Sequence, residues 1–256
     1  MLVSARLMLI KQELQKKSVL TLREMTALLD VSESTVRRDF DELEKAGELI
    51  RVYGGAMKPK DSITLSETIE PTMNEKEVYN IDSKKLLCTE AAKLIQDGDC
   101  VFIDGGTTFK FLFQLLSQKR VKIVTHSLLY LRDLKDAQAE IIVIGGCYNV
   151  KYGMNVGQIT SDLLSQFNFD YAFIGCVGMD IQTRVIFTAD IETASIKQIA
   201  IKHANRKLLL ADSTKMNTKG FYTFGRLSTF DAVFTDAYPE GVDCPDNVII
   251  CKPDDA

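Results

Sequence analysis

The sequence contains few of the residues from which metal and redox sites are built. It has two histidines, His126 and His203, and its six cysteines include no C-x-x-C pair. A zinc site with ordinary Cys and His spacing therefore cannot be assembled from neighbouring residues. Most of the cysteines lie in apolar runs, so we expect buried free thiols in a reducing compartment, and neither a metal nor a cofactor.

Long apolar runs and an excess of positive charge are also missing. No stretch approaches the ~20 apolar residues that span a membrane, and Arg6 and Lys11 interrupt the apolar start too early for a signal-peptide core. The net charge is −4 and the pI is about 5.4, which argues against a protein that coats nucleic acid nonspecifically. We expect a soluble, cytoplasmic protein without a membrane partner.

The chain has enough length and apolar content for two domains, one of them small. It has 256 residues, of which 46% are hydrophobic. Hydrophobic periodicity fades over residues 58–81, a stretch rich in charge and hydroxyl groups with prolines at 59 and 71. We therefore predict a first domain at residues 1–57, a linker at 58–81 and a second domain at 82–256.

Residues 21–53 carry the clearest local pattern. Thr21 and Glu24 have the spacing of a capping box, which opens a helix. The residues that then recur at helical spacing and predict one buried face are Leu22, Met25, Leu28 and Leu29. The packing stripe of an earlier helix, which completes a three-helix core, consists of Leu7, Ile10 and Leu14.

A second helix follows a tight turn, and Ser32 is placed to cap it. Its apolar stripe consists of Val36, Phe40 and Leu43. Its opposite stripe consists of Ser34, Arg37, Arg38 and Asp41. Two adjacent arginines early in a short helix after a tight turn are what a DNA recognition helix requires, because a guanidinium bonds guanine O6 and N7 bidentately.

The sequence that follows this helix predicts a β-wing. Gly47 ends the helix, and residues 49–53 with the two glycines after them predict a strand with a flexible tip, where Arg51 is placed to reach a phosphate or the minor groove. The whole run predicts a winged helix-turn-helix, although an ordinary amphipathic helix with a solvated charged face is the alternative. The residues expected to contact DNA are Thr21, Ser32, Ser34, Thr35, Arg37, Arg38 and Arg51.

The second domain alternates helices with short apolar strands. The predicted strands are residues 100–103, 121–124, 141–144, 171–174, 207–211, 232–235 and 248–251. The predicted helices are residues 84–96, 109–116, 160–166 and 192–203. Near-continuous apolar strands separated by helices predict an α/β fold with a mainly parallel sheet covered on both faces.

Polar loops follow five of these strands, at residues 104–108, 125–127, 145–146, 175–178 and 212–215. Ligands of open parallel sheets bind beyond the carboxyl ends of the strands. Glycines let backbone N–H groups approach an anion, and Lys215 adds a charge, so the loops predict a site for a small phosphorylated sugar or polyol. Taken singly, each loop also fits a turn or a cap: Thr125 and Ser127 are candidate caps of a helix at 128–134, and His126 is expected to be structural.

Both domains resemble the DeoR family of sugar-responsive bacterial repressors. The resemblance lies first in ALLDVSESTVRRDFDEL and RVYGGA, and then in AAKLIQDGDCVFIDGGTT, VTHSL, IGGCYN, FDYAFIGCVGMD, SIKQIAI and LLLADSTK. It implies a sensor domain that resembles ribose-5-phosphate isomerase in fold and senses phosphorylated intermediates of sugar catabolism. The effector-binding residues that it implies are Asp104, Gly106, Thr107, Thr108, Thr125, Ser127, Gly145, Gly146, Lys197 and Lys215.

Three positions depart from the family pattern. His126 stands where the family usually has Asn. Asn149 stands where Arg is common, with Lys151 nearby as a candidate substitute. Thr193 stands where Glu is common, which leaves Glu192 displaced by one position. These departures leave the identity of the effector open.

The two domains together predict an effector-controlled transcription factor, most simply a repressor that binds double-stranded operator DNA and is released by a phosphorylated sugar. Residues 1–57 carry nine basic and nine acidic side chains, so a single DNA-binding domain should bind modestly. We therefore expect a homo-oligomer, a dimer or tetramer, that joins two weak contacts on two half-sites.

Two other functions fit the sequence less well. A sugar-phosphate isomerase with an accessory DNA-binding domain needs carboxylates for proton transfer, but the loop where the isomerase resemblance implies acids reads IGCVG, at 174–178. Asp104, Asp180 and Asp212 remain near it along the predicted strand ends. A purely structural adaptor would leave Arg37 and Arg38 without a role. We therefore expect no enzymatic activity.

Overall fold

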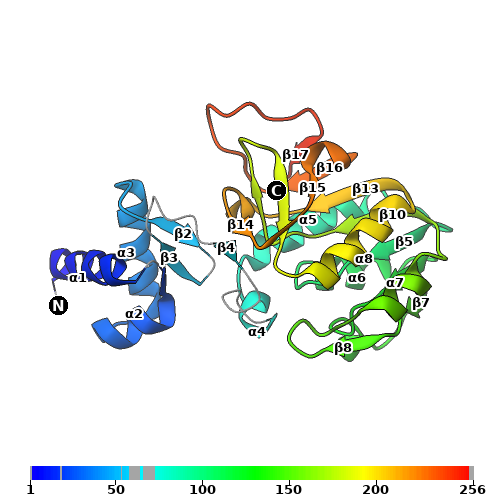
Figure 1. Cartoon of the computed structure of the whole chain (residues 1–256), viewed down its shortest axis with the longest axis horizontal. Helices are drawn as coiled ribbons and strands as arrows, with labels where there is room; N and C mark the ends of the chain where they lie inside the picture. The colour runs from blue at the N-terminus through cyan, green and yellow to red at the C-terminus, as the bar shows by residue number, and fades with distance from the viewer. Residues whose placement is uncertain (1, 18, 53, 58–63, 66–72, 254–256) are drawn as a thin grey trace. The chain divides into compact units, whose positions relative to one another are not determined.

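The computed structural model describes residues 2–17, 19–52, 54–57, 64–65 and 73–253. The chain forms two compact units, Met1–Thr64 and Leu65–Ala256 (Figure 1). Much of the predicted linker, at 58–63 and 66–72, lies outside the described residues. Its described part contains strand β4 (Thr64–Leu65), helix α4 (Met73–Glu77) and the first residue of helix α5 (Ile81–Ala92).

The N-terminal unit is a winged helix-turn-helix, as predicted. Its helices are α1 (Val3–Lys16), α2 (Leu22–Leu29) and α3 (Glu33–Lys45). Its strands are β1 (Val19–Thr21), β2 (Ile50–Val52) and β3 (Gly55–Met57), which pair antiparallel in the order β1-β3-β2. The side chains of Ile10, Met25 and Phe40, one from each helix, are buried and form the centre of this small core.

Local sequence accounts for how the helices of this unit begin and end. The Thr21 and Glu24 capping box forms at the start of α2, and the Ser32 hydroxyl accepts a hydrogen bond from Thr35 N at 3.3 Å at the start of α3. Gly47, with φ of +70°, ends α3, and Glu48 N donates back to Leu43 O at 2.9 Å.

One predicted core residue of α2 was wrong. Leu28 is 54% exposed, whereas Leu22, Met25 and Leu29 are buried. Successive residues are about 100° apart around a helix, so Leu28 lies a quarter-turn from the centre of the buried stripe.

The C-terminal unit is built on a seven-stranded sheet in which every described pairing is parallel, as predicted. Its strands are β5 (Cys100–Ile103), β6 (Lys122–Thr125), β7 (Glu140–Val143), β10 (Phe169–Ile174), β13 (Ala204–Leu210), β16 (Ala232–Thr235) and β17 (Val248–Ile250). Their order across the sheet is β17-β16-β13-β10-β5-β6-β7.

Helices cover both faces of this sheet (Figure 1). Alternate residues of a strand face opposite clusters: Val101 and Ile103 pack with α5 and α6 (Phe109–Leu116), whereas Phe102 packs in the cluster that includes α7 (Gln158–Leu164) and α8 (Ile191–Lys202). The near-continuous apolar strands therefore result from burial on two sides.

Several smaller elements were not predicted. Strands β8 (Cys147–Asn149) and β9 (Met154–Val156) form a hairpin, and β11 (Gly178–Asp180), β12 (Val185–Thr188) and β15 (Tyr222–Arg226) form an antiparallel sheet. The remaining elements are strand β14 (Lys219–Gly220) and the 3-10 turns η1 (Leu131–Asp133), η2 (Ser213–Lys215) and η3 (Leu227–Thr229). The helix considered at 128–134 is therefore only a 3-10 turn.

The prediction that the cysteines are buried free thiols is correct for some of the six cysteines. All six cysteines are free, and Cys88 and Cys251 are buried, but Cys147 and Cys244 are exposed. In the described part of the chain, we find no helix with both the length and the apolar character needed to cross a membrane.

Candidate functional site

The exposed end of α3 gathers three hydroxyl groups. Ser32 Oγ lies 2.8 Å from Ser34 Oγ and 2.9 Å from Thr35 Oγ1. Ser32 and Ser34 are exposed and Thr35 is half-buried, at the end of the helix where backbone N–H groups are directed outward. Hydroxyls at a helix N-terminus are suited to phosphate oxygens.

The two predicted recognition arginines lie on the outside of the same helix. Arg38 is exposed, and the side chain of Arg37 is 37% exposed and forms a weak pair with Glu33 at 3.4 Å. Neither guanidinium is packed into the core. Both therefore lie on the surface of the unit, and the pair of Arg37 with Glu33 is of the exposed kind that contributes little stability.

Two other predicted DNA-contacting residues are engaged within the unit. Thr21 Oγ1 accepts from Glu24 N at 3.1 Å and donates to Glu24 Oε2 at 2.9 Å. Arg51 pairs with Asp41 of α3, and the Arg51 backbone N–H donates to Glu44 Oε1 at 2.7 Å. The Arg51 side chain is 28% exposed. The structure thus places the wing arginine against the recognition helix rather than extended from the wing.

An ion pair that the sequence analysis did not identify joins α1 to the inner side of α3. Arg6 donates to Asp39 twice, from Nε at 2.7 Å and from Nη2 at 2.8 Å. The Asp39 side chain is 3% exposed. Asp39 lies in a highly charged stretch of sequence, where an acidic residue is ordinarily exposed. The only sequence signal for its burial is its position on the helix, on the same side as Val36 and Phe40.

The five polar loops of the C-terminal unit lie at one edge of the sheet. They follow β5, β6, β7, β10 and β13, which are five adjacent strands in the order β13-β10-β5-β6-β7. Because these strands are parallel, their carboxyl ends share one edge. The five loops therefore lie along one edge of the sheet, which we call the strand-end edge.

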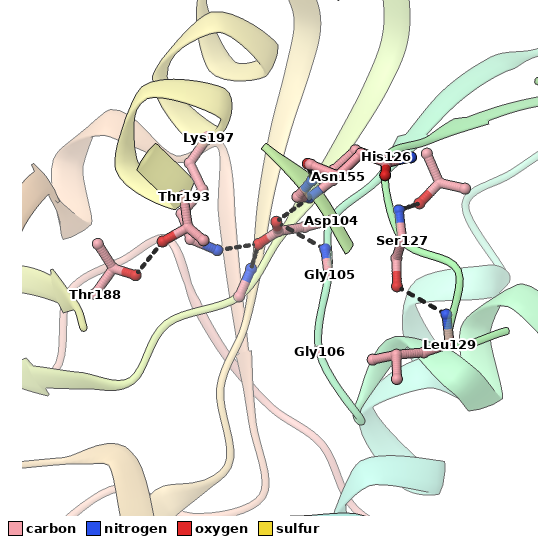
Figure 2. Close-up of polar contacts among 12 residues, drawn as sticks. Asp104, Gly105, Gly106, His126, Ser127, Leu129, Asn155, Thr188, Thr193 and Lys197 are labelled. Carbon is pink, nitrogen blue, oxygen red and sulfur yellow. Dashed lines mark hydrogen bonds and ion pairs between the residues drawn. The ribbon is translucent and has the colours of Figure 1, made fainter. Parts of the chain in front are cut away.

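The carboxylate of Asp104 is at the centre of the strand-end edge and is fully buried (Figure 2). Oδ1 accepts from Gly105 N at 2.8 Å and lies 3.4 Å from His126 Nε2. Oδ2 accepts from Gly175 N at 2.9 Å and pairs with the Lys197 ammonium. Burial acts to raise the pKa of Asp104, but the charge of Lys197 and the His126 ring outweigh it and lower that pKa. The carboxylate is thus ionised and has its acceptor positions occupied.

His126 and Lys197 are the two side chains that hold this carboxylate. His126 is buried, and its Nδ1 lies 2.8 Å from Asn155 O, so both ring nitrogens face oxygen atoms. Lys197 extends from α8, whose first turn is capped by the Asp190 carboxylate at 3.2 Å and 3.0 Å from two backbone nitrogens. This arrangement supports the structural role predicted for His126.

The predicted hydroxyl groups are largely buried beside Asp104. Thr125 Oγ1 accepts from Ser127 N at 3.1 Å, and Ser127 Oγ accepts from Leu129 N at 3.3 Å (Figure 2). These hydroxyls shape the loop after β6 instead of capping a helix. Thr107 is buried and Thr108 is half-buried, directly before α6.

The glycines of the strand-end edge differ in their exposure and in their structural role. Gly106, with φ of +130°, is half-buried in the loop after β5. Gly145 and Gly146 are exposed, but a Cβ on Gly146 would lie 1.8 Å from Thr160 Oγ1, and Gly145 O accepts from the same hydroxyl at 3.0 Å. The glycine pair therefore has a packing role against α7 whether or not a ligand is present.

Lysines supply the positive charge on the other side of this edge. Lys215 is half-buried in η2, after β13. Lys84, which the sequence analysis did not identify, is buried in α5, and its Nζ donates to Thr107 Oγ1 at 3.1 Å. Burial, followed by the charge of Lys215, lowers the pKa of Lys84 to about 8. No sequence signal separates Lys84 from the exposed Lys85 beside it except helical phase.

In the part of the chain that the structure describes, no group of three or more His, Cys, Asp or Glu side chains is arranged to hold a metal ion. The strand-end edge offers backbone N–H groups, hydroxyls and ammonium groups, which are suited to an anionic, hydroxyl-bearing ligand.

Comparison with known proteins finds matches over both units. Residues 6–61 match the DeoR-like helix-turn-helix domain, and residues 79–237 match the DeoR C terminal sensor domain. The chain is 33% identical to the uncharacterized HTH-type transcriptional regulator FruR of Bacillus subtilis (strain 168), over 93% of this chain and 92% of that protein.

Two further relatives are named repressors. A lactose phosphotransferase system repressor of Staphylococcus epidermidis is 33% identical over 86% of this chain and 87% of that protein. The glycerol-3-phosphate regulon repressor of Haemophilus influenzae is 29% identical over 89% of this chain and 87% of that protein. Among solved structures, a D-ribose-5-phosphate isomerase with bound phospho-erythronic acid matches 53% of this chain and 54% of that chain, with 18% identity and a TM-score of 0.39.

Proposed function

Since the chain belongs to the DeoR family of transcriptional repressors, we propose that it represses a sugar or polyol catabolic operon and is released by a phosphorylated sugar. One observation carries this proposal. A unit with outward arginines at the start of a recognition helix is joined, in one chain, to a unit whose polar loops meet at the ends of five adjacent strands.

The DNA partner that we propose is a double-stranded operator, with α3 in the major groove. Arg37 and Arg38 contact base edges or phosphates, while Ser32, Ser34 and Thr35 hold phosphate oxygens at the helix N-terminus. The exposure of Ser32, Ser34 and Arg38 supports this role. Arg51 and Thr21 help to hold the helix and wing that would contact DNA, since each side chain is already bonded within the unit.

The effector site that we propose is the strand-end edge. Gly106, Thr107, Thr108 and Lys215 offer N–H groups, hydroxyls and a charge to the phosphate, next to the start of α6. Thr125, Ser127, Gly145 and Gly146 complete the edge on the side of β6 and β7. Asp104 and Lys197 hold each other in place and orient the loops that face the ligand. The names of the two repressor relatives, which refer to lactose and to glycerol 3-phosphate, support an effector from sugar or polyol metabolism.

We propose that the protein works as a homo-oligomer without enzymatic activity. Equal numbers of acidic and basic residues in the DNA-binding unit favour joining two units on two half-sites. Sugar-phosphate isomerisation needs a carboxylate that accepts a proton, and the Asp104 oxygens are occupied by four donors. Turnover of ribose 5-phosphate by the pure protein would contradict this part of the proposal.

A mobility-shift titration tests the proposal. The full-length protein is titrated onto the promoter DNA next to its own gene, with and without a panel of sugar phosphates and the matching unphosphorylated sugars. We expect a specific shift that one phosphorylated compound reverses and its unphosphorylated form does not. A Lys215→Ala variant should bind the DNA normally but need more effector for release. Absence of a specific shift on the neighbouring promoters would count against the function.

A further inference from the structure

Lys84 connects the strand-end edge to helix α4, which lies in the C-terminal part of the predicted linker. It is 3% exposed near the start of α5. Its Nζ donates to Thr107 Oγ1 at 3.1 Å and to the backbone oxygen of Lys76 in α4. Thr107 Oγ1 lies 3.4 Å from the same Lys76 oxygen. The ammonium, the hydroxyl and the carbonyl therefore form one closed cluster.

No carboxylate in the described part of the chain contacts this buried ammonium. Its two oxygen partners are neutral. A buried ammonium is unfavourable unless its charge and its three donors are compensated. Burial, then the charges of Lys215 and Lys76, lower the pKa of Lys84 to about 8, and Asp212 and Glu77 oppose this only in part. The cluster therefore favours an added anion.

The start of α6 adds to this preference. Thr107 and Thr108 directly precede α6, and no side chain caps its first turn. The first N–H groups of a helix and its dipole attract negative charge. An anion beside Thr107 would therefore meet Lys84, Lys215 and the N-terminus of α6 together.

The same segment is bound to the strand-end edge at two more places. Asn80 Nδ2 donates to Asp212 Oδ1 and to Thr214 Oγ1, each at 3.1 Å. Ser83 Oγ donates to Asp236 Oδ2 at 2.7 Å. Residues 76–84 thus contact the loops that follow β5, β13 and β16. Residues 76–81 form the end of the predicted linker, which joins this unit to the DNA-binding unit along the chain.

We propose that Lys84 binds the phosphate-type anion of the effector and, in doing so, releases the Lys76 carbonyl, which loosens α4. This inference rests on the proposed effector site. In this structure, Lys84 and Thr107 hold α4 by the backbone oxygen of Lys76. A charged oxygen beside Thr107 forms the stronger, charge-assisted hydrogen bond and displaces the neutral carbonyl. The anion therefore binds the loosened state more tightly than the held state, which is what a switch requires.

The test compares Lys84→Met with Lys85→Met in the full-length protein, using inorganic phosphate as the probe. Lys85 is the exposed neighbour on the same helix, so its variant loses an equal charge outside the cluster. Calorimetry should give a phosphate Kd that is about tenfold higher or more for Lys84→Met and unchanged for Lys85→Met. Hydrogen exchange of residues 73–84 should accelerate with phosphate in the wild type. In Lys84→Met it should be fast without phosphate.

Thr107→Val provides a second variant if Lys84→Met fails to fold, because it keeps the side-chain shape and removes the shared hydroxyl. It should also weaken phosphate binding and speed exchange. If Lys84→Met binds phosphate as tightly as Lys85→Met, the role of Lys84 is overturned while the effector site stands. If phosphate binds through Lys84 but exchange of residues 73–84 does not change, the coupling is overturned. If the wild type shows no saturable phosphate binding, the site and this inference both fail.

Discussion

Some charged side chains of this protein are directed outward, whereas others are buried and hold distant elements together. Arg38 is exposed, and the side chain of Arg37 is 37% exposed and pairs with Glu33 at 3.4 Å. Asp104 and Asp39, in contrast, are buried and bonded to cations more than thirty residues away in sequence. We propose that the first pair contacts DNA, whereas the second pair holds the elements of each unit in place.

Arg37→Ala is expected to weaken operator binding and to relax sequence preference. The loss should be about 1–3 kcal/mol if the guanidinium bonds a base bidentately. Fluorescence anisotropy with the operator and with single-base variants measures both effects. Lys45→Ala, at the exposed end of the same helix, is the control. Equal losses for the two variants on every sequence would indicate a phosphate contact instead.

Asp104→Asn is expected to destabilise the C-terminal unit, because it leaves the buried Lys197 ammonium without its counter-charge. Breaking such a pair by removing one partner costs about 3–5 kcal/mol. Denaturant unfolding followed by circular dichroism measures the loss, with Asp180→Asn as a control at a half-buried site.

The same pair has a defined pH dependence. The folded-state pKa of Asp104 lies below its ordinary value. Its stabilising contribution is therefore fully present above the unfolded pKa of about 3.9 and is lost as the pH falls through the lower folded value. The difference in stability between wild type and Asp104→Asn should shrink only in that acid range. A difference that shrinks at neutral pH would contradict the assignment.

At the scale of elements, the recognition helix and the wing are fastened to each other. Asp41 and Glu44 lie three residues apart on one face of α3, where one binds the Arg51 side chain and the other its backbone. β2 is an edge strand of its sheet, so its Arg51 N–H points away from β3 and is satisfied by a side chain. This clamp fixes the distance between the helix and the wing.

Asp41→Asn is expected to release Arg51 toward the DNA backbone. One added phosphate contact should steepen the slope of log affinity against log salt by about 0.9. Glu42→Gln, which removes an exposed carboxylate of the same helix away from Arg51, is the control. Adding Arg51→Gln to Asp41→Asn should restore the original slope. If the double variant keeps the steeper slope, the added phosphate contact does not come from Arg51.

At the scale of the whole molecule, the DNA-binding unit has little net charge to attract DNA. Its nine basic residues are matched by nine acidic ones in residues 1–57. We therefore propose that specific binding depends on joining two such units on one operator. Linking two weak contacts raises affinity by about 10²–10⁴-fold when geometry permits both.

Operators with two half-sites should therefore bind far more tightly than DNA with one. We expect a gain within that range when the half-sites are one or more helical turns of about 10–10.5 base pairs apart, and a smaller gain at half-turn offsets. Titration of the full-length protein onto a set of spaced duplexes measures it. Equal affinity for one and two half-sites would exclude the linked arrangement.

The sequence by itself determined the local order of both units. Four features predicted the helix-turn-helix, because each acts on neighbours within a few residues. They are the capping box, the Ser32 N-cap, the pair of arginines and the glycine that ends the helix. Near-continuous apolar strands predicted a parallel sheet, and polar loops after five of them predicted one shared edge, since parallel strands end on the same side.

Only the tertiary structure decided which side chains meet. Asp104 binds Lys197 from 93 residues away and Gly175 from 71 residues away. Helical periodicity indicated that one face of α5 is buried, but not that Lys84 on that face meets Thr107, nor that Asp39 meets Arg6. Periodicity reports which direction a side chain points, whereas its partner depends on the order of strands across the sheet and on packing between distant elements.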